Sequence, residues 1–165
     1  MVTLNDGFFE SAVECNEDLG GGHFKVRLRF PETAVPPRPG QFVLLKMPPS
    51  RWPGPDPLLF RPFSVYSYRP GYVEVFYKVV GRFTRGLANL GPGDPVLLVG
   101  PLGNGFPPNL SRSGDFLILV AGGTGVAPLH FFAQSLMEGT VSKEGRGRRA
   151  VGQPVALLGG VSSAG

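Results

Sequence analysis

The chain has 165 residues, which allows one or two small domains with a substantial core. Hydrophobic residues make up 42% and charged residues only 17%, and this balance excludes a disordered chain. The net charge of +4 comes mostly from scattered residues without interleaved aromatics, which argues against nucleic-acid binding. The single cysteine excludes a disulfide framework and a metal cluster held by several thiolates within this chain.

No targeting or membrane segment is expected. Residues 1–10 lack the basic start and long apolar run of a secretory signal. No segment approaches the roughly 20 apolar residues that span a bilayer. We therefore expect a cytoplasmic protein with no membrane span.

The first 110 residues carry the pattern of an all-β domain, and the 25 glycines and 18 prolines favour short strands and turns. Apolar or alternating runs predict strands at residues 24–30, 41–47, 63–68, 72–80 and 95–99. Thr84 is a predicted N-cap for a short helix over residues 84–90. These five runs and one small helix, with a sixth strand to which no range is assigned, predict a closed six-stranded antiparallel barrel in residues 1–110.

The pattern changes in residues 111–165. Residues 115–120 form a continuous apolar run, as expected for a parallel strand that is buried on both faces. Residues 126–138 then space their apolar side chains at helical intervals, and residues 155–158 form the next strand. This order predicts one right-handed parallel βαβ unit, an incomplete part of a nucleotide-binding domain.

Two loops are expected from composition alone. Residues 48–57 contain five prolines, which excludes a helix or a central strand. Residues 139–152 are polar and include Arg146, Arg148 and Arg149, for which a solvated loop and a phosphate contact are both possible roles.

The turn Gly122-Gly123-Thr124-Gly125 joins the predicted strand to the predicted helix. Glycines there let the backbone approach a ligand, and the helix N-terminus offers free N–H groups to a pyrophosphate. Pro128 occupies the position of the third glycine in the usual dinucleotide-binding pattern. A tight turn without a ligand is the alternative interpretation.

The segment Arg61-Pro62-Phe63-Ser64 could hold a flat, anionic cofactor. An arginine can bind a pyrophosphate with two hydrogen bonds, a phenylalanine offers a flat face, and a serine hydroxyl can donate or accept. Strand alternation predicts that Arg61 and Phe63 share one side and that Ser64 lies on the other. Taken alone, the segment is equally consistent with an ordinary barrel strand.

The remaining candidate residues favour structural roles. His23 and His130 have no partner at metal-ligand spacing, and His130 is expected to be a partly exposed helical residue. Cys15 is expected to be buried, and Phe131 and Phe132 to lie in a core. No side chains are arranged as a catalytic triad or as a metal site, so we predict no catalytic side chain.

The order of R-P-x-S and G-G-x-G-x-A-P after a barrel resembles the ferredoxin–NADP reductase superfamily. Residues 77–85 (YKVVGRFTR) and 100–106 (GPLGNGF) are similar to the electron-transfer subunit of bacterial dihydroorotate dehydrogenase. The resemblance implies that the barrel binds FAD, with Arg61 near the pyrophosphate and Ser64 near the reactive edge of the ring. It implies these FAD contacts: Arg61, Pro62, Phe63, Ser64, Phe76, Tyr77, Lys78, Phe83 and Thr84.

The resemblance also implies that Gly122, Gly123, Thr124 and Gly125 face the NAD(H) side. Phe83 stands where the family has a glycine, which raises the question of local backbone geometry, because phenylalanine tolerates positive φ poorly. The family carries a [2Fe–2S] cluster on four cysteines, and this chain has none after Cys15. The chain is therefore expected to be a C-terminally truncated member.

The resemblance implies a flavoprotein oxidoreductase that receives electrons from NADH. The electrons would pass through an iron–sulfur centre to a catalytic dihydroorotate dehydrogenase subunit, in a hetero-oligomer that serves pyrimidine biosynthesis. NADH is preferred over NADPH because residues 159–163 contain no arginine for a 2′-phosphate. The alternatives are a related flavin reductase for ferredoxin or sulfide, and a flavin-binding module without turnover.

Overall fold

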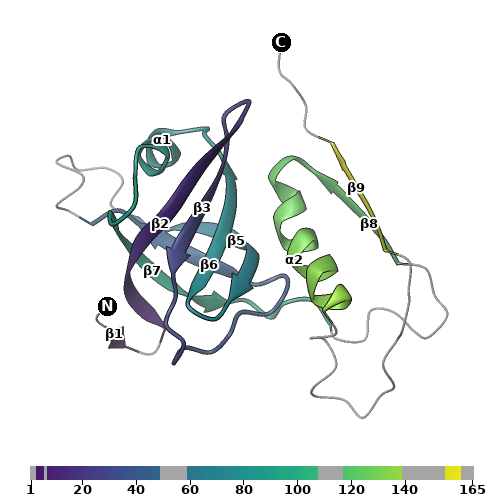
Figure 1. Ribbon diagram of the computed structural model, residues 1–165, viewed down its shortest axis with the longest axis horizontal. Coiled ribbons are helices and arrows are strands. Elements are labelled where there is room, and N and C mark those ends of the chain that lie inside the picture. Colours follow the sequence, from purple (N-terminus) through teal and green to yellow (C-terminus); the bar gives the residue numbers. More distant parts are fainter. Residues whose placement is uncertain (1–2, 6, 49–58, 108–116, 139–154, 161–165) are drawn as a thin grey trace.

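The structure is a computed structural model that describes residues 3–5, 7–48, 59–107, 117–138 and 155–160. A barrel formed by the N-terminal strands lies beside a helix that is backed by two further strands (Figure 1). The loops expected at residues 48–57 and 139–152, with their arginine cluster, fall almost entirely outside the described residues.

Six antiparallel strands close the barrel in the order β2-β3-β6-β5-β4-β7, and β7 pairs back with β2. The predicted six-stranded antiparallel barrel is therefore confirmed. The short strand β1 (Thr3–Asn5) pairs with β2 outside the ring. The barrel strands are β2 (Phe8–Gly20), β3 (His23–Arg29), β4 (Phe42–Lys46), β5 (Arg61–Arg69), β6 (Tyr72–Lys78) and β7 (Pro95–Leu102).

The longest strand is β2, and the sequence analysis did not assign a strand to its residues. It has 13 residues and pairs with β7 through its first half and with β3 through its second half. Only Phe9, Ser11 and Val13 are buried along it, and most of the residues that follow Val13 are exposed. Buried and exposed side chains therefore alternate only in the first half of β2, because the second half projects as a hairpin arm beyond the core.

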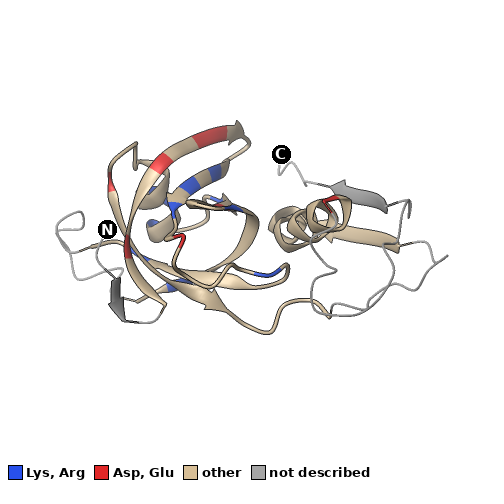
Figure 2. Ribbon diagram, turned by 60° about the horizontal axis from the view of Figure 1, so that its bottom comes forward, with Lys and Arg blue, Asp and Glu red and all other residues tan. Residues whose placement is uncertain are grey.

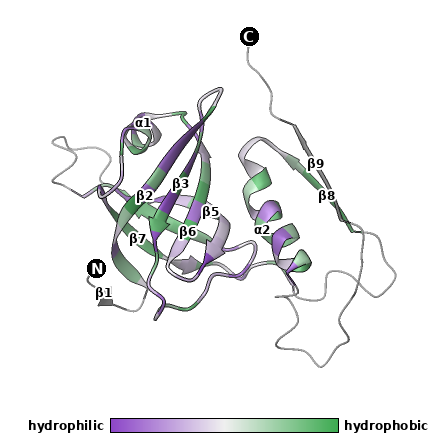
Figure 3. Cartoon of the chain, viewed as in Figure 1, coloured by the Kyte–Doolittle hydropathy of each residue, from purple (hydrophilic) through white to green (hydrophobic). Residues whose placement is uncertain are grey.

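The barrel core is aliphatic and closely packed. Val26 on β3 lies opposite Val75 on β6, and Val65 on β5 lies opposite the same Val75. Figure 3 shows the resulting hydrophobic colour along the barrel strands. The side chains at 0–1% exposure include Val13, Val26, Leu28, Val43, Leu45, Val65, Val73, Val75 and Leu98.

The outer side of the barrel carries paired charges, visible as acidic and basic bands in Figure 2. The Arg27 guanidinium lies 2.9 Å from the Glu74 carboxylate, which also accepts a hydrogen bond from Ser67. Burial alone would raise the pKa of Glu74, but these two hydrogen bonds and the positive charges of Lys25 and Arg27 together outweigh burial and lower the pKa. Cys15 also lies on the exposed part of β2, so the expectation of a buried cysteine is wrong.

The helix α1 (Arg82–Ala88) begins two residues before the predicted helix. Its N-cap is Gly81, so Thr84 is not the N-cap. Thr84 instead caps from the third helical position, where its Oγ1 accepts hydrogen bonds from the N–H groups of Val80 and Gly81. Phe83 lies within this helix and is only 6% exposed, and no described non-glycine residue has a positive φ. The strain expected at Phe83 is therefore absent.

The strand β8 (Leu117–Gly122), the short 3-10 turn η2 (Gly123–Gly125), the helix α2 (Val126–Met137) and the strand β9 (Val155–Gly160) follow the barrel. β8 and β9 are parallel, which confirms the predicted βαβ unit. Leu119 faces α2 and is buried against Phe132 and Ala133. Ile118 and Val120 are 65% and 72% exposed. The expectation of burial on both faces is therefore wrong for β8, since α2 covers one face only.

Three contacts join α2 to the barrel. Phe131 is 7% exposed and is part of the barrel core, as its predicted packing role requires. The His130 ring stacks on Tyr66 of β5. Glu138, just past the end of α2, pairs with Arg69 at the end of β5. The βαβ unit is therefore held against one side of the barrel.

Candidate functional site

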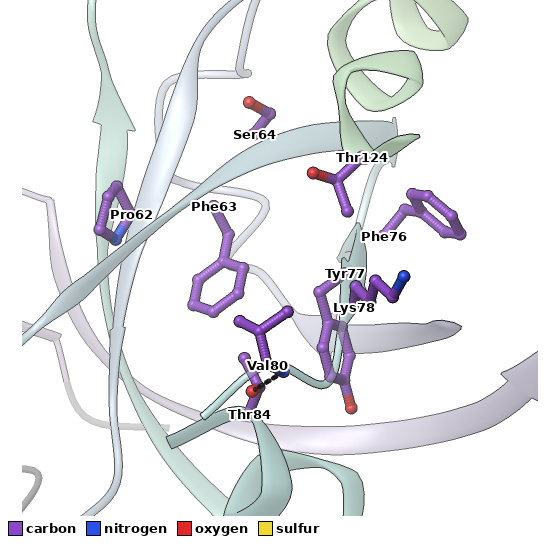
Figure 4. A pocket seen from close by; sticks show the side chains of 9 residues that line it. All are labelled: Pro62, Phe63, Ser64, Phe76, Tyr77, Lys78, Val80, Thr84 and Thr124. Atoms are coloured by element: carbon purple, nitrogen blue, oxygen red, sulfur yellow. Dashed lines mark hydrogen bonds between the residues drawn. The ribbon is translucent and has the colours of Figure 1, made fainter. Parts of the chain in front are cut away.

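A cleft of about 260 Å³ opens between the barrel strands β5 and β6, the start of α1 and the η2 turn. Figure 4 shows its lining, with Phe63 and Ser64 on opposite sides of β5, as strand alternation predicts. Eight of the nine lining residues belong to the set that the sequence singles out, and only Val80 does not. The lining residues are Pro62, Phe63, Ser64, Phe76, Tyr77, Lys78, Val80, Thr84 and Thr124.

The wall on the barrel side is aromatic. Phe63 and Tyr77 meet edge to face, with their ring centroids 6.1 Å apart. Behind them, the Phe83 ring lies 5.8 Å from Phe63. Phe83 does not line the cleft and instead supports Phe63 from the core. The arrangement offers an apolar surface with fixed ring orientations to a flat ligand.

Tyr77 is fixed by a residue that the sequence analysis did not identify. Its hydroxyl donates to Asn16 Oδ1 at 3.2 Å, and burial raises the pKa of this phenol. The Asn16 amide in turn donates to the carbonyls of Leu87 and Leu90, at 2.8 and 3.0 Å. Asn16 thus ties the end of α1 to the cleft wall. No local motif marks it, because its partners are 61 or more residues away.

The entry to α1 forms a second part of the lining. The Thr84 hydroxyl lies 2.9 Å from the Val80 nitrogen and 3.0 Å from the Gly81 nitrogen. These bonds fix the turn that presents Val80, whose side chain is 77% exposed. A large apolar side chain that is this exposed at the edge of a cleft can contact a ligand without cost to the fold.

One cation lines the cleft. Lys78 follows Tyr77 at the end of β6, and Figure 4 shows its side chain beside Phe76 and Thr124. Arg61 does not line the cleft, and its Nη1 atom lies 3.4 Å from the Phe60 carbonyl oxygen. Among the described residues of the lining, the positive charge therefore comes from Lys78.

The η2 turn contributes Thr124 and open backbone. A Cβ atom placed on Gly122, Gly123 or Gly125 would meet nothing within 4 Å. Gly123 has φ +54°, so it needs glycine for its conformation, but Gly122 and Gly125 have φ values that any residue adopts. Neither conformation nor internal packing explains these two glycines. The open space at both positions leaves room for a ligand.

The histidines are held by aromatic neighbours. His23 stacks on Phe76 with 5.6 Å between the centroids, and His130 stacks on Tyr66. In the described ranges no three His, Cys, Asp or Glu side chains come together as a metal site. Within the same ranges, no helix has the length and apolar character needed to cross a bilayer.

The sequence is similar to curated electron transfer subunits of dihydroorotate dehydrogenase B (NAD(+)). The subunit of Bacillus caldolyticus is 43% identical over 101 residues, which are 60% of this chain and 38% of the relative. The subunit of Clostridium acetobutylicum is 41% identical over 135 residues, which are 82% of this chain and 45% of the relative. The chain thus spans less than half the length of these relatives. No protein-family model matches it.

Solved structures share the fold. An NADH-dependent reduced ferredoxin-NADP oxidoreductase is 26% identical with a TM-score of 0.71, over 92% of this chain and 48% of that chain. The Amycolatopsis cytochrome P450 reductase GcoB is 26% identical with a TM-score of 0.68, over 93% and 43%. A ferredoxin NADP+ reductase from Neisseria gonorrhoeae with bound FAD and NADP has a TM-score of 0.67 at 20% identity, over 94% and 58%.

Proposed function

From its relation to the dihydroorotate dehydrogenase B electron transfer subunits, we propose that this chain is the FAD-binding part of such a subunit. It would exchange electrons between NAD(H) and flavin for a catalytic dihydroorotate dehydrogenase partner in cytoplasmic pyrimidine biosynthesis. The observation that supports this most directly is the cleft, whose lining includes seven of the nine flavin-contact residues expected from the sequence. The proposed division is a flavin barrel in residues 1–110 and a nucleotide unit in residues 111–165.

The residues present fit a flavin dinucleotide. The Phe63 and Tyr77 rings offer an apolar wall for the ring system, and Ser64 offers a hydroxyl beside it. Lys78 offers a positive charge for a phosphate or an anionic ring. The chemistry supplied by bound FAD is hydride exchange with a nicotinamide and release of single electrons. The role of this chain is to bind and orient.

We propose that Arg61 and Lys78 both contact negatively charged groups of FAD, each at a different place. Lys78 lies in the cleft lining, whereas Arg61 lies next to Pro62 at the start of β5. An extended dinucleotide needs more than the 260 Å³ of the cleft, so part of it would extend beyond the lining residues. Pyrophosphate binding by Arg61 therefore remains part of the proposal.

The nicotinamide nucleotide is assigned to the η2 turn. The exposed Thr124 hydroxyl and the open Gly122 and Gly125 leave room for a pyrophosphate at the start of α2. Thr124 also lines the flavin cleft, so the two ligands would meet there. This shared edge is the geometry that electron exchange between them requires.

Electron delivery beyond the flavin requires groups that this chain lacks. Its one cysteine cannot supply the four thiolates of the [2Fe–2S] cluster expected in the family. We propose that the cluster and the catalytic subunit belong to the complete hetero-oligomeric enzyme. The barrel and the η2 turn would carry out the first step, between nicotinamide and flavin.

The test is anaerobic titration of the FAD-loaded chain with NADH, followed by flavin absorbance. Stoichiometric bleaching by NADH is the result expected from the proposal. A chain that retains FAD but is not bleached by NADH is a flavin-binding module without turnover. A chain that does not take up FAD contradicts the proposal. Reduction of the flavin by dihydroorotate, measured with the catalytic subunit present, would identify that subunit as the redox partner. It would thereby exclude ferredoxin and sulfide as alternatives.

A further inference from the structure

The contact between α2 and β5 is built around His130. Its ring lies 3.9 Å from the Tyr66 ring, measured between centroids, and the two planes differ by 4°. Its Nδ1 atom lies 3.1 Å from the Tyr66 carbonyl oxygen, so Nδ1 carries the proton and donates. A single side chain thus makes a face-to-face contact and a hydrogen bond to the same residue.

Tyr66 is placed for this contact by an irregularity of the barrel. The β5–β6 register shifts between Val65 and Ser67, so Tyr66 stands at the shift. Such irregularities turn a side chain out of its regular alternation and disturb the local ladder. The Tyr66 carbonyl and ring are both turned to α2, because both contact His130.

The contact continues to the cleft. The Tyr66 ring lies 6.0 Å from Phe76, which lines the cleft. Ser64, two residues before Tyr66 on the same strand, lines it as well. On the other side of the contact, His130 lies on the helix that follows the η2 turn, six residues after Thr124. His130 therefore connects α2, the helix that directly follows the η2 turn, to the strands that carry Ser64 and Phe76.

We propose that His130 is a positioning residue that holds the η2 turn over the flavin cleft by its contact with Tyr66. This inference rests on the proposed function, because it concerns the alignment of the flavin and nicotinamide sites. His130 itself does not line the cleft. Its loss leaves the barrel wall intact and releases the turn, so the two sites lose their alignment while the flavin wall keeps its structure.

Hydrogen–deuterium exchange with and without FAD tests the inference. In the wild type, FAD slows exchange in a peptide covering residues 61–69 and also in one covering residues 120–128. In His130→Ala we expect the first protection to remain and the second to fall at least threefold. We expect FAD affinity to change by less than twofold, since no contact of the barrel wall is lost.

Matched variants separate the two parts of the contact and control for general loosening of α2. His130→Asn retains a donor near the Nδ1 position and is expected to recover part of the protection. His130→Phe retains a flat ring without the hydrogen bond and tests the stacking alone. Met137→Ala, at a residue of the same helix that is 76% exposed, should behave as the wild type.

Three outcomes overturn the inference. Protection of residues 120–128 that is unchanged in His130→Ala shows that the contact positions nothing. Equal loss of protection in both peptides shows that His130 stabilises the whole protein and does not position the turn. Wild-type protection that is confined to residues 61–69 shows that the turn does not lie over bound FAD. Absence of protection from both peptides in the wild type contradicts the proposed function itself.

Discussion

The two sides of the cleft are built in different ways. On the barrel side, side chains form the surface and each is held from behind: Phe63 by Phe83, Tyr77 by Asn16, and the Val80 turn by Thr84. On the η2 side, Thr124 is the one side chain that lines the cleft, and the rest is backbone with open space around it. The barrel therefore offers a ligand fixed side chains, whereas the turn offers it open backbone.

Glycines show the same contrast. In the barrel, Gly40 has φ +87°, and a Cβ there would lie 2.8 Å from the Phe106 backbone nitrogen. On the turn, a Cβ on Gly125 would meet nothing within 4 Å, and its φ is −62°. The first glycine is required by the fold. The second is free for a ligand, and the same Gly→Ala change should therefore have opposite consequences at the two positions.

The largest effect is expected from Gly40→Ala. The substitution combines a strained φ with a backbone clash, so the free energy of unfolding should fall by about 2–4 kcal/mol. Urea unfolding followed by circular dichroism measures this. An unchanged midpoint would show that the Gly40 turn can move away from Phe106, and the contrast between the two glycines would lose its basis.

The next effect concerns the cation of the barrel side. Lys78→Ala should weaken FAD binding by about 1.5–3 kcal/mol, because it removes a charged contact in the cleft. The matched variant Arg61→Ala should weaken it less, since Arg61 lies outside the lining. Fluorescence titration at low and high salt measures both. A larger effect at Arg61 would show that Arg61, and not Lys78, makes the stronger contact to the negative charge of FAD.

Asn16→Ala tests whether the barrel side is held from behind. It removes the acceptor of the Tyr77 hydroxyl and a side-chain donor to the Leu87 and Leu90 carbonyls, which should cost about 1–2 kcal/mol of stability. FAD affinity should fall as well, because Tyr77 loses its fixed orientation. Calorimetric melting and FAD titration measure the two effects. Loss of stability with unchanged FAD affinity would show that Tyr77 needs no support to bind.

The smallest effect on stability is expected from Gly125→Ala. The residue is helical in conformation, so alanine should be neutral or stabilise by about 0.5 kcal/mol. NAD+ affinity of the FAD-loaded chain should nevertheless fall about tenfold, or ~1.4 kcal/mol, because the new methyl group occupies the space left for the ligand. Isothermal calorimetry measures this. Unchanged NAD+ affinity would show that the η2 turn has only a structural role.

Much of the fold could be predicted from local pattern. The strands over residues 61–69 and 72–78 and the helix over residues 126–137 follow from apolar periodicity and turn residues. The strand β2 was not predicted, and its exposed second half lacks the alternation that would mark a strand. Burial of β8 on both faces was wrong, since a continuous apolar run reports the hydropathy of a strand and not which elements cover it.

The candidate site was predictable where a motif carries its residues in sequence. Eight lining residues lie in four short segments that the sequence marks. The contacts Asn16–Tyr77 and Tyr66–His130 could not be identified, because their partners lie 61 and 64 residues apart in the sequence. Val80 was missed for another reason: an exposed valine has no signature until its place beside a cleft is known.

The central claim, that this cleft binds FAD, is tested most directly by titrating FAD into the wild type and Val80→Asp. Val80 is 77% exposed, so an aspartate there should not affect folding but should repel the ligand. Val35→Asp, at 74% exposure and outside the cleft lining, is the matched control. We expect saturable quenching of FAD fluorescence in the wild type and the control, and binding at least tenfold weaker in Val80→Asp. Equal binding by all three proteins, or none by the wild type, would contradict the account.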